Sequence, residues 1–167
     1  EPALVLDLPE PWQQAYHQAT AALQGPCKLL LTSYFGSVDH HWDLIRSLPV
    51  DGLHLDCVAG NQPGAEQLAT LPSHWVISLG VINGRNIWRA DLSQKFDALA
   101  PLVRQFGERL WLGSSCSLLH SPLDLAAETG LDNEVRSWFA FARQKCIELT
   151  LLAGALDQAD DLRLQQL

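Results

Sequence analysis

Several side chains in this sequence are of types that could support chemistry. His54, Asp56 and Cys57 lie within four residues of one another, and all three types can ligate a metal ion. On a β-strand, however, His54 and Asp56 would point to one side and Cys57 to the other. A buried hydrogen bond between His54 and Asp56 is therefore a better interpretation than a metal site.

Two further groups lie closer to the middle and end of the sequence. Cys116 and His120 could act as a nucleophile and its base, but no third group is placed to orient the base, which favours a structural cysteine. Arg85 and Arg89 could bind a carboxylate or a phosphate. The alternative is that these arginines are solvated, or that one of them pairs with the nearby Asp91.

The elements that must position these residues alternate along the chain. Short apolar runs predict strands at residues 27–32, 52–58, 75–82 and 109–113. Amphipathic periodicity predicts helices at residues 10–23, 39–48, 63–71, from Ser93 as an N-cap, and in one long segment from 132 to 156. The first helix is expected to bury Trp12, Tyr16, Ala19 and Leu23. The last stretch, residues 160–167, is expected either to form another helix or to fray.

This alternation is typical of an α/β fold with a parallel sheet and right-handed crossovers. Two architectures fit: a doubly wound open sheet, or part of a (β/α)8 barrel. A complete barrel needs about 250 residues, whereas the chain has 167, enough for half. No glycine-rich phosphate loop follows any predicted strand, which argues against dinucleotide binding. In both architectures, function gathers at the carboxyl ends of the strands, and the loops at residues 82–91 and 114–120 are long and polar.

Composition narrows the possible partners. The formal net charge of −8 argues against binding to nucleic acid or to an anionic membrane surface. No apolar run reaches the roughly 18–20 residues of a membrane span. The four cysteines are widely spaced, form no CxxC pair and are expected to be reduced thiols of a cytoplasmic protein.

Five stretches resemble the amino-terminal barrel of cobalamin-independent methionine synthases. They are EPALVLDLP at residues 1–9, LLLTSYFG at 29–36, GVINGRNIWRADL at 80–92, SSCSLLHSP at 114–122 and SWFAFA at 137–142. The resemblance follows the order of the sequence over nearly the whole chain. Proteins of the uroporphyrinogen decarboxylase type share the expected fold, but these motifs match them less well.

The resemblance implies an enzyme of two facing barrels that transfers a methyl group from methyltetrahydrofolate polyglutamate to homocysteine. A zinc ion in the carboxyl-terminal barrel would bind and activate the homocysteine sulfur. This chain reads Thr32-Ser33-Tyr34 where the catalytic barrel has a His-x-Cys pair. Asp56 and Cys116 lie near the positions of two other ligands and are interpreted as remnants of a lost zinc site. We therefore expect no metal, no cofactor and no catalytic residue in this chain.

The resulting hypothesis is that residues 1–167 form a single segment, the second half of the non-catalytic barrel. The chain alone would be inactive. It would support the catalytic barrel and line the folate cleft through Asn83 and Arg85. Its partners would be the rest of its own barrel, the catalytic barrel and, when isolated, a second copy of itself. The alternative is a free-standing α/β ligand-binding module without catalytic activity.

Overall fold

The fold contains a sheet of parallel strands, as the alternating pattern predicts. The computed structural model describes residues 2–158. Within them, four parallel strands lie in the order β1-β2-β3-β4. Their bounds are β1 Leu30–Thr32, β2 Gly52–Asp56, β3 Val76–Ile82 and β4 Leu110–Ser114. Each strand lies within or close to its expected range, so the α/β class is confirmed.

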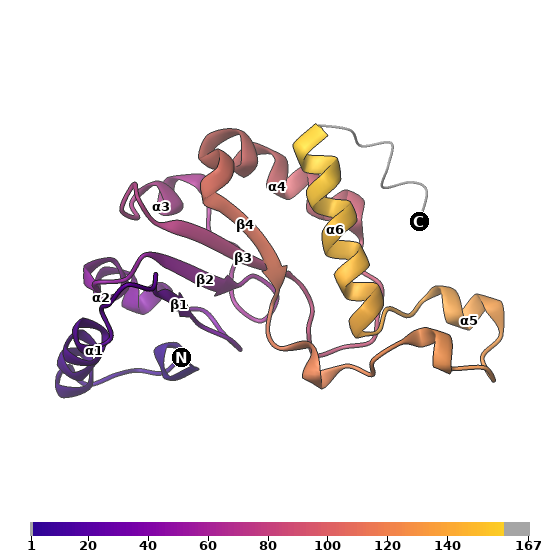
Figure 1. The fold of residues 1–167 in the computed structure, drawn as a ribbon, viewed down its shortest axis with the longest axis horizontal. Coiled ribbons are helices and arrows are strands. Elements are labelled where there is room, and N and C mark those ends of the chain that lie inside the picture. The colour runs from indigo at the N-terminus through magenta and orange to yellow at the C-terminus, as the bar shows by residue number, and fades with distance from the viewer. Residues whose placement is uncertain (1, 159–167) are drawn as a thin grey trace.

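Helices connect the strands and cover one side of the sheet. The α-helices are α1 Glu10–Ala22, α2 Trp42–Ser47, α3 Ala65–Ala69, α4 Leu92–Phe106, α5 Asn133–Ser137 and α6 Ala142–Gln158. Short 3-10 helices are η1 Pro2–Val5, η2 Asp39–His41, η3 Gly107–Arg109, η4 Leu118–His120 and η5 Leu125–Ala127. Figure 1 shows α2, α3, α4 and α6 arranged in an arc along one side of the sheet. The expected helix at 160–167 lies outside the described residues. None of the described helices is long and apolar enough to cross a membrane.

The register of the strands separates the two faces of the sheet. Leu53, Leu55, Ile77 and Leu79 are buried in the core beneath the helices. The opposite face carries the aligned residues Thr32, His54, Ser78 and Trp111. This second face is more polar than the apolar runs of the sequence suggested. The reason is that Leu31 and Ile77, which belong to those runs, point to the helix-covered face.

Large apolar side chains nevertheless remain open on this second face. Trp111 is 53% exposed and Leu30 is 42% exposed. Together with Val76 they line a hollow of about 330 Å³. The outer strands β1 and β4 each pair with one neighbour among the described residues, so each has one unpaired edge. Unpaired edges and exposed aromatic surface favour association with further protein.

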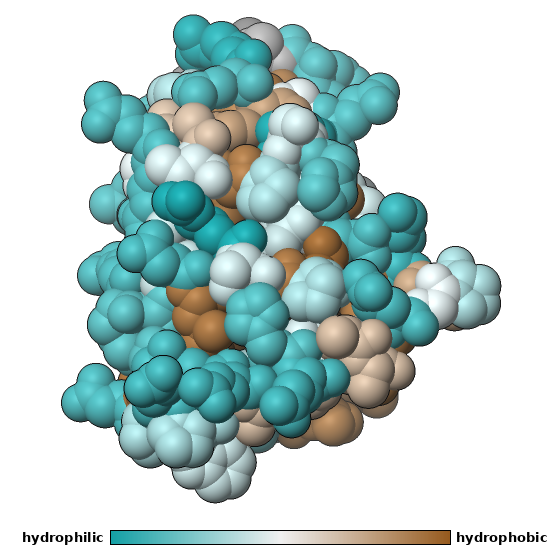
Figure 2. Space-filling model, turned by 90° about the vertical axis from the view of Figure 1, so that its left-hand side faces the viewer, coloured by the Kyte–Doolittle hydropathy of each residue, from teal (hydrophilic) through white to brown (hydrophobic). Residues whose placement is uncertain are grey.

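Helix α1 has the expected bounds, but most of its expected inner face is exposed. Tyr16 packs against the core, whereas Trp12 and Leu23 are 63% and 66% exposed. Ala19 is exposed as well. Figure 2 looks at the side of the molecule where α1 lies in Figure 1, and apolar atoms interrupt the polar surface there. The amphipathic pattern therefore predicted the helix correctly but not its burial in this chain.

Helix α4 begins two residues before its expected start. Asp91 is the N-cap in place of Ser93, and its side chain accepts a hydrogen bond from the backbone N–H of Gln94 at 2.9 Å. Aspartate is as good an N-cap as serine. Leu99 and Leu102 of this helix are buried. The helix ends at Phe106, and its C-cap is Gly107, whose φ of 54° suits glycine.

The prediction of a single long helix at 132–156 is wrong. The structure has two helices, α5 and α6, and residues 138–141 between them belong to neither: Trp138 forms a turn and Phe139 a β-bridge. Phe139 forms an antiparallel bridge with Trp88. The N–H of Ala140 donates to the carbonyl of Ile87 at 2.7 Å, and the N–H of Arg89 donates to the carbonyl of Trp138 at 2.9 Å. These long-range bonds replace the helical ones, so the helix is interrupted.

Candidate functional site at the carboxyl edge of the sheet

Four side chains from three loops meet at the carboxyl edge of the sheet. Tyr34 and Phe35 follow β1, Arg85 follows β3 and His120 follows β4; we call them the rim cluster. The Arg85 guanidinium carbon lies 4.7 Å from the centre of the Phe35 ring. The Phe35 ring is 5.8 Å from that of Tyr34 and 6.3 Å, edge-on, from that of His120. Arg85, Phe35 and His120 are exposed, so the cluster is open to a ligand.

The backbone of Phe35 has an unusual conformation. Its φ is 72°, in the left-handed region, which costs a non-glycine residue roughly 1–2 kcal/mol. The N–H of Phe35 donates to Oδ2 of Asp56 at 2.9 Å. This bond fixes the backbone of Phe35, whose ring contacts Arg85. Strained backbone of this kind is concentrated at binding sites.

Asp56 therefore organises the loops at this edge. Its side chain is buried, and Oδ1 accepts bonds from the N–H groups of Val58 and Ala59, both at 2.8 Å. Each carboxylate oxygen is thus already an acceptor of backbone hydrogen bonds. No group of three metal-ligating side chains lies together among residues 2–158. Whether Asp56 and Cys116 are remnants of a zinc site stays a prediction, while the present role of Asp56 is structural.

The expected hydrogen bond between His54 and Asp56 is wrong. His54 Nδ1 lies 2.8 Å from the hydroxyl oxygen of Ser78, because the register of β2 and β3 places Ser78 directly beside it. The ring of Tyr34 packs edge-on against His54 at 5.8 Å. Burial lowers the pKa of His54, and the nearby charge of Asp56 opposes this shift without cancelling it. His54 thus supports the rim cluster from below as a neutral ring.

The cysteines of the candidate sites are poorly suited to catalysis. Burial raises the pKa of Cys57 to about 12, so its thiol stays protonated at neutral pH. Burial also raises the pKa of Cys116, whose thiol donates to the carbonyl of Ser117 at 3.7 Å. No hydrogen bond joins Cys116 to His120, which packs on Phe35 instead. These observations agree with the interpretation of Cys116 as a structural residue.

The loop after β3 presents Arg85 through close backbone contacts. Oδ1 of Asn83 accepts a bond from the N–H of Arg85 at 2.8 Å. The N–H of Gly84 donates to the hydroxyl of Ser115 at 3.1 Å. A Cβ atom on Gly84 would lie 2.7 Å from the carbonyl oxygen of Cys116, so only glycine fits here. The alternative that Arg85 pairs with Asp91 is wrong. The guanidinium of Arg85 lies over the Phe35 ring, whereas the side chain of Asp91 caps α4.

Sequence reasoning missed a buried charged pair that holds this loop from behind. Lys145 is 1% exposed, and its Nζ donates to Oδ1 of Asn86 at 3.0 Å and to the carbonyl of Trp88 at 3.1 Å. Oε1 of Glu148 accepts from the N–H of Ala90 at 3.0 Å. Burial lowers the pKa of Lys145 and raises that of Glu148. The sequence did contain a signal for the burial of Lys145 and Glu148, because their spacing places them on the same face of the helix as the inward-facing Leu152.

The chain is therefore an α/β protein of successive parallel strand–helix units, with an aromatic and arginine-containing rim at the carboxyl edge of its sheet. Residues 1–107 match the family model described as "Cobalamin-independent synthase, N-terminal domain". The chain belongs to this family, as the resemblance of its motifs predicted.

Named relatives agree with this assignment over the whole chain. Proteins named 5-methyltetrahydropteroyltriglutamate–homocysteine methyltransferase from Yersinia enterocolitica and Yersinia pestis are each 60% identical over 167 residues. They match 100% of this chain but only 22% of their own length. A third, from Sodalis glossinidius, is 60% identical over 162 residues, which are 96% of this chain and 21% of the relative. The chain thus spans about a fifth of these relatives.

Proposed function

We propose that this chain is the second half of the non-catalytic, amino-terminal barrel of a cobalamin-independent methionine synthase. The full-length enzyme would transfer a methyl group from methyltetrahydrofolate polyglutamate to homocysteine, as the names of the relatives indicate for those proteins. In this role the segment is structural, has no catalytic residue of its own and lines the folate cleft. The catalytic zinc belongs to the other barrel, and the enzyme is cytoplasmic.

The observation that carries this proposal is the exposed Arg85 guanidinium held over the Phe35 ring at the carboxyl edge. An arginine can bind a carboxylate through two parallel hydrogen bonds, and an aromatic ring can stack on a flat heterocycle. A folate polyglutamate carries both a flat ring and several carboxylates. Asn83 contributes by fixing the backbone of Arg85 rather than through a free side-chain oxygen.

The half-barrel interpretation accounts for the open parts of the structure. The first and last strands keep unpaired edges, and one face of the sheet exposes Trp111 and Leu30. In a closed (β/α)8 barrel, additional strands pair with both edges and side chains fill the interior. The exposed Trp12 and Leu23 on α1 would likewise be covered by neighbouring elements.

Replacing Arg85 by alanine in the full-length enzyme tests the proposal. We expect the Michaelis constant for the folate substrate to rise about tenfold, which corresponds to roughly 1.4 kcal/mol of lost binding. The constant for homocysteine should change little, because homocysteine binds at the zinc of the other barrel. Arg104→Ala, at an exposed position on α4, is the matched control. Unchanged constants for both substrates would remove Arg85 from the folate cleft.

The isolated chain is expected to self-associate through its open edges and uncovered sheet face. A few hundred Å² of exposed apolar surface is worth several kcal/mol at about 25 cal/mol per Å². Sedimentation velocity at micromolar concentration should therefore detect dimers or larger species, and Trp111→Glu should shift them toward monomer. A stable monomer that binds no apolar dye would instead favour the free-standing ligand-binding module.

A further inference from the structure

A cavity of about 470 Å³ lies apart from the rim cluster, between α6, α5 and the start of α4. Its walls are mostly apolar and include Leu125, Phe139, Ile147 and Leu151. Arg89 and Glu148 are among the charged residues that line it. Cavities that bind small molecules typically measure about 300–1,000 Å³ and combine apolar walls with a few polar groups. The cavity is therefore of a suitable size and composition for a small ligand.

Glu148, a residue that lines this cavity, has one side-chain oxygen with an unmet hydrogen bond. Glu148 is 6% exposed, and its Oε1 accepts from the N–H of Ala90 at 3.0 Å. Its Oε2 is buried and has no hydrogen-bond partner within the described residues. Leaving a buried polar atom unpaired costs about 1–3 kcal/mol, and more when the group is charged. A ligand that donates to Oε2 would recover this free energy.

The nearby cations do not meet this need. Lys145 uses its ammonium on Asn86 and Trp88, and Nη1 of Arg89 donates to the carbonyl of Ser137 at 3.2 Å. Lys145 and Arg89 both act to lower the pKa of Glu148, but burial outweighs them and the pKa is raised. Lys145 and Arg89 thus do not fully offset the cost of burying the negative charge of Glu148. An additional positive charge beside this carboxylate would be stabilising.

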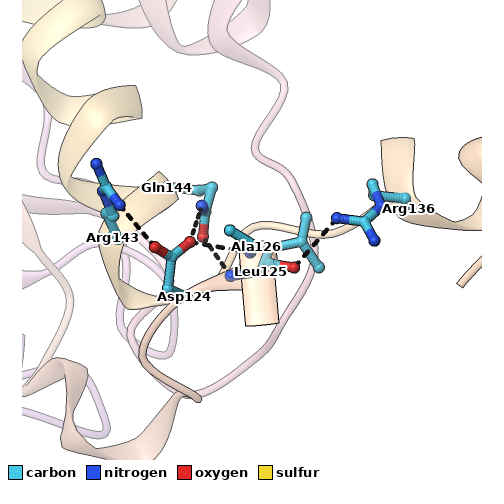
Figure 3. A network of polar contacts seen from close by, with 6 residues as sticks. All are labelled: Asp124, Leu125, Ala126, Arg136, Arg143 and Gln144. Atoms are coloured by element: carbon cyan, nitrogen blue, oxygen red, sulfur yellow. Dashed lines mark hydrogen bonds and ion pairs between the residues drawn. The ribbon is translucent and has the colours of Figure 1, made fainter. Parts of the chain in front are cut away.

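The wall of the cavity is held in shape before any ligand arrives. Figure 3 shows Asp124 between Arg143 and Gln144, which donate to its two oxygens at 2.7 and 2.8 Å. Oε1 of Gln144 accepts from the N–H of Leu125 at 3.2 Å, and Arg136 donates to the Leu125 carbonyl at 3.3 Å. These contacts fix the loop that carries Leu125. A preformed wall reduces the entropy lost on binding.

We propose that this cavity binds a small molecule with an apolar body and a primary ammonium group, and that the ammonium donates to Oε2 of Glu148. The apolar body packs against Leu125, Phe139, Ile147 and Leu151. A neutral donor such as a hydroxyl could also reach the oxygen, but a charge-assisted bond is about twice as strong. This site is separate from the folate cleft, so it does not depend on the proposed function of the rim.

The test is a titration of the ¹⁵N-labelled 167-residue chain with 3-methylbutylamine, followed by the amide resonances of Ala90, Ile147 and Leu151. Saturable shifts are expected at these positions. The alcohol and the carboxylic acid of the same carbon skeleton are the comparison probes, and both should bind at least tenfold more weakly. Equal binding of the amine and the alcohol would overturn the proposal.

Variants make the role of Glu148 measurable. Glu148→Gln keeps the size of the side chain and can still accept from Ala90, but should weaken amine binding at least tenfold. Ile147→Trp leaves Glu148 intact and fills the mouth of the cavity, so it should abolish binding without removing a buried charge. Glu66→Gln, at an exposed position on α3, is the matched control. Unchanged affinity in both cavity variants would show that the amine binds elsewhere.

An ammonium group could also come from a lysine side chain elsewhere in the full-length polypeptide. The same titration of that longer protein distinguishes the two sources. Binding of the amine by both proteins supports a small-molecule site. Binding by the 167-residue chain alone would overturn it, because it would show that another part of the polypeptide already fills the cavity.

Discussion

Replacing Lys145 by alanine is expected to lower the free energy of unfolding by about 3 kcal/mol. The substitution leaves Oδ1 of Asn86 and the carbonyl of Trp88 without their donor in a buried environment, and each such loss costs about 1–3 kcal/mol. It also leaves Glu148 with less compensation for its charge. The helix and the loop at 86–90 would then separate more easily, because this lysine joins α6 to that loop.

Urea denaturation gives the required comparison, provided that the slope of the transition is unchanged. Lys145→Met restores the lost volume but no donor, so it should recover only the part of the loss that comes from the cavity. Arg104→Ala removes an exposed cation from α4 and should change stability by less than about 0.5 kcal/mol. Faster hydrogen exchange at the N–H of Ala90 should accompany the Lys145 variants. A Lys145→Ala protein as stable as the Arg104→Ala protein would refute this account.

Replacing Asp56 by alanine is expected to cost about 3 kcal/mol or more. Its carboxylate accepts three backbone hydrogen bonds, from Phe35, Val58 and Ala59, and hydrogen bonds to charged groups contribute about 1.5–3 kcal/mol each. Part of this loss is offset because water can reach the exposed Val58 and Ala59 once the side chain is removed. The positive φ of Phe35 would also lose its support.

Asp56→Asn separates these contributions. An asparagine has one carbonyl oxygen, which can still accept from Val58 and Ala59, while its amide nitrogen cannot accept from Phe35. We expect a loss of about 1–2 kcal/mol and a change in the environment of the Phe35 ring, visible by NMR. Asp97→Ala, at an exposed position on α4, serves as the control. If Asp56→Asn were as damaging as Asp56→Ala, the bond to Phe35 would be the dominant one.

The parallel direction of the strands and the location of the rim follow from general rules once the strands are identified. Apolar runs of four to eight residues separated by amphipathic segments predict parallel strands, and the residues after each strand must then meet at one edge. Arg85, Asn83, Asp56 and Cys116 were found in this way, and all four lie near the carboxyl edge. Motif resemblance supplied the family, which composition and periodicity could not.

Partners within the site were decided by tertiary contacts. Sequence spacing predicted a hydrogen bond between His54 and Asp56. The strand register instead brings His54 within hydrogen-bond distance of Ser78, and Asp56 accepts hydrogen bonds from backbone N–H groups of two loops. Arg85 lies over Phe35, fifty residues earlier in the sequence. Short-range patterns carry no information on such pairings, because strand register and loop closure fix them.

The sequence by itself determined the α/β class, the approximate limits of the strands and the family of this protein. Local propensity and apolar periodicity depend only on residues close together in the sequence, so they can be recognised without knowledge of the fold. Only the tertiary structure decided that the segment at 138–141 is not helical and that Lys145 and Glu148 are buried. The physical reason is that backbone groups of 87–90 bond to residues more than forty positions away. Those bonds outweigh the local preference for a continuous helix.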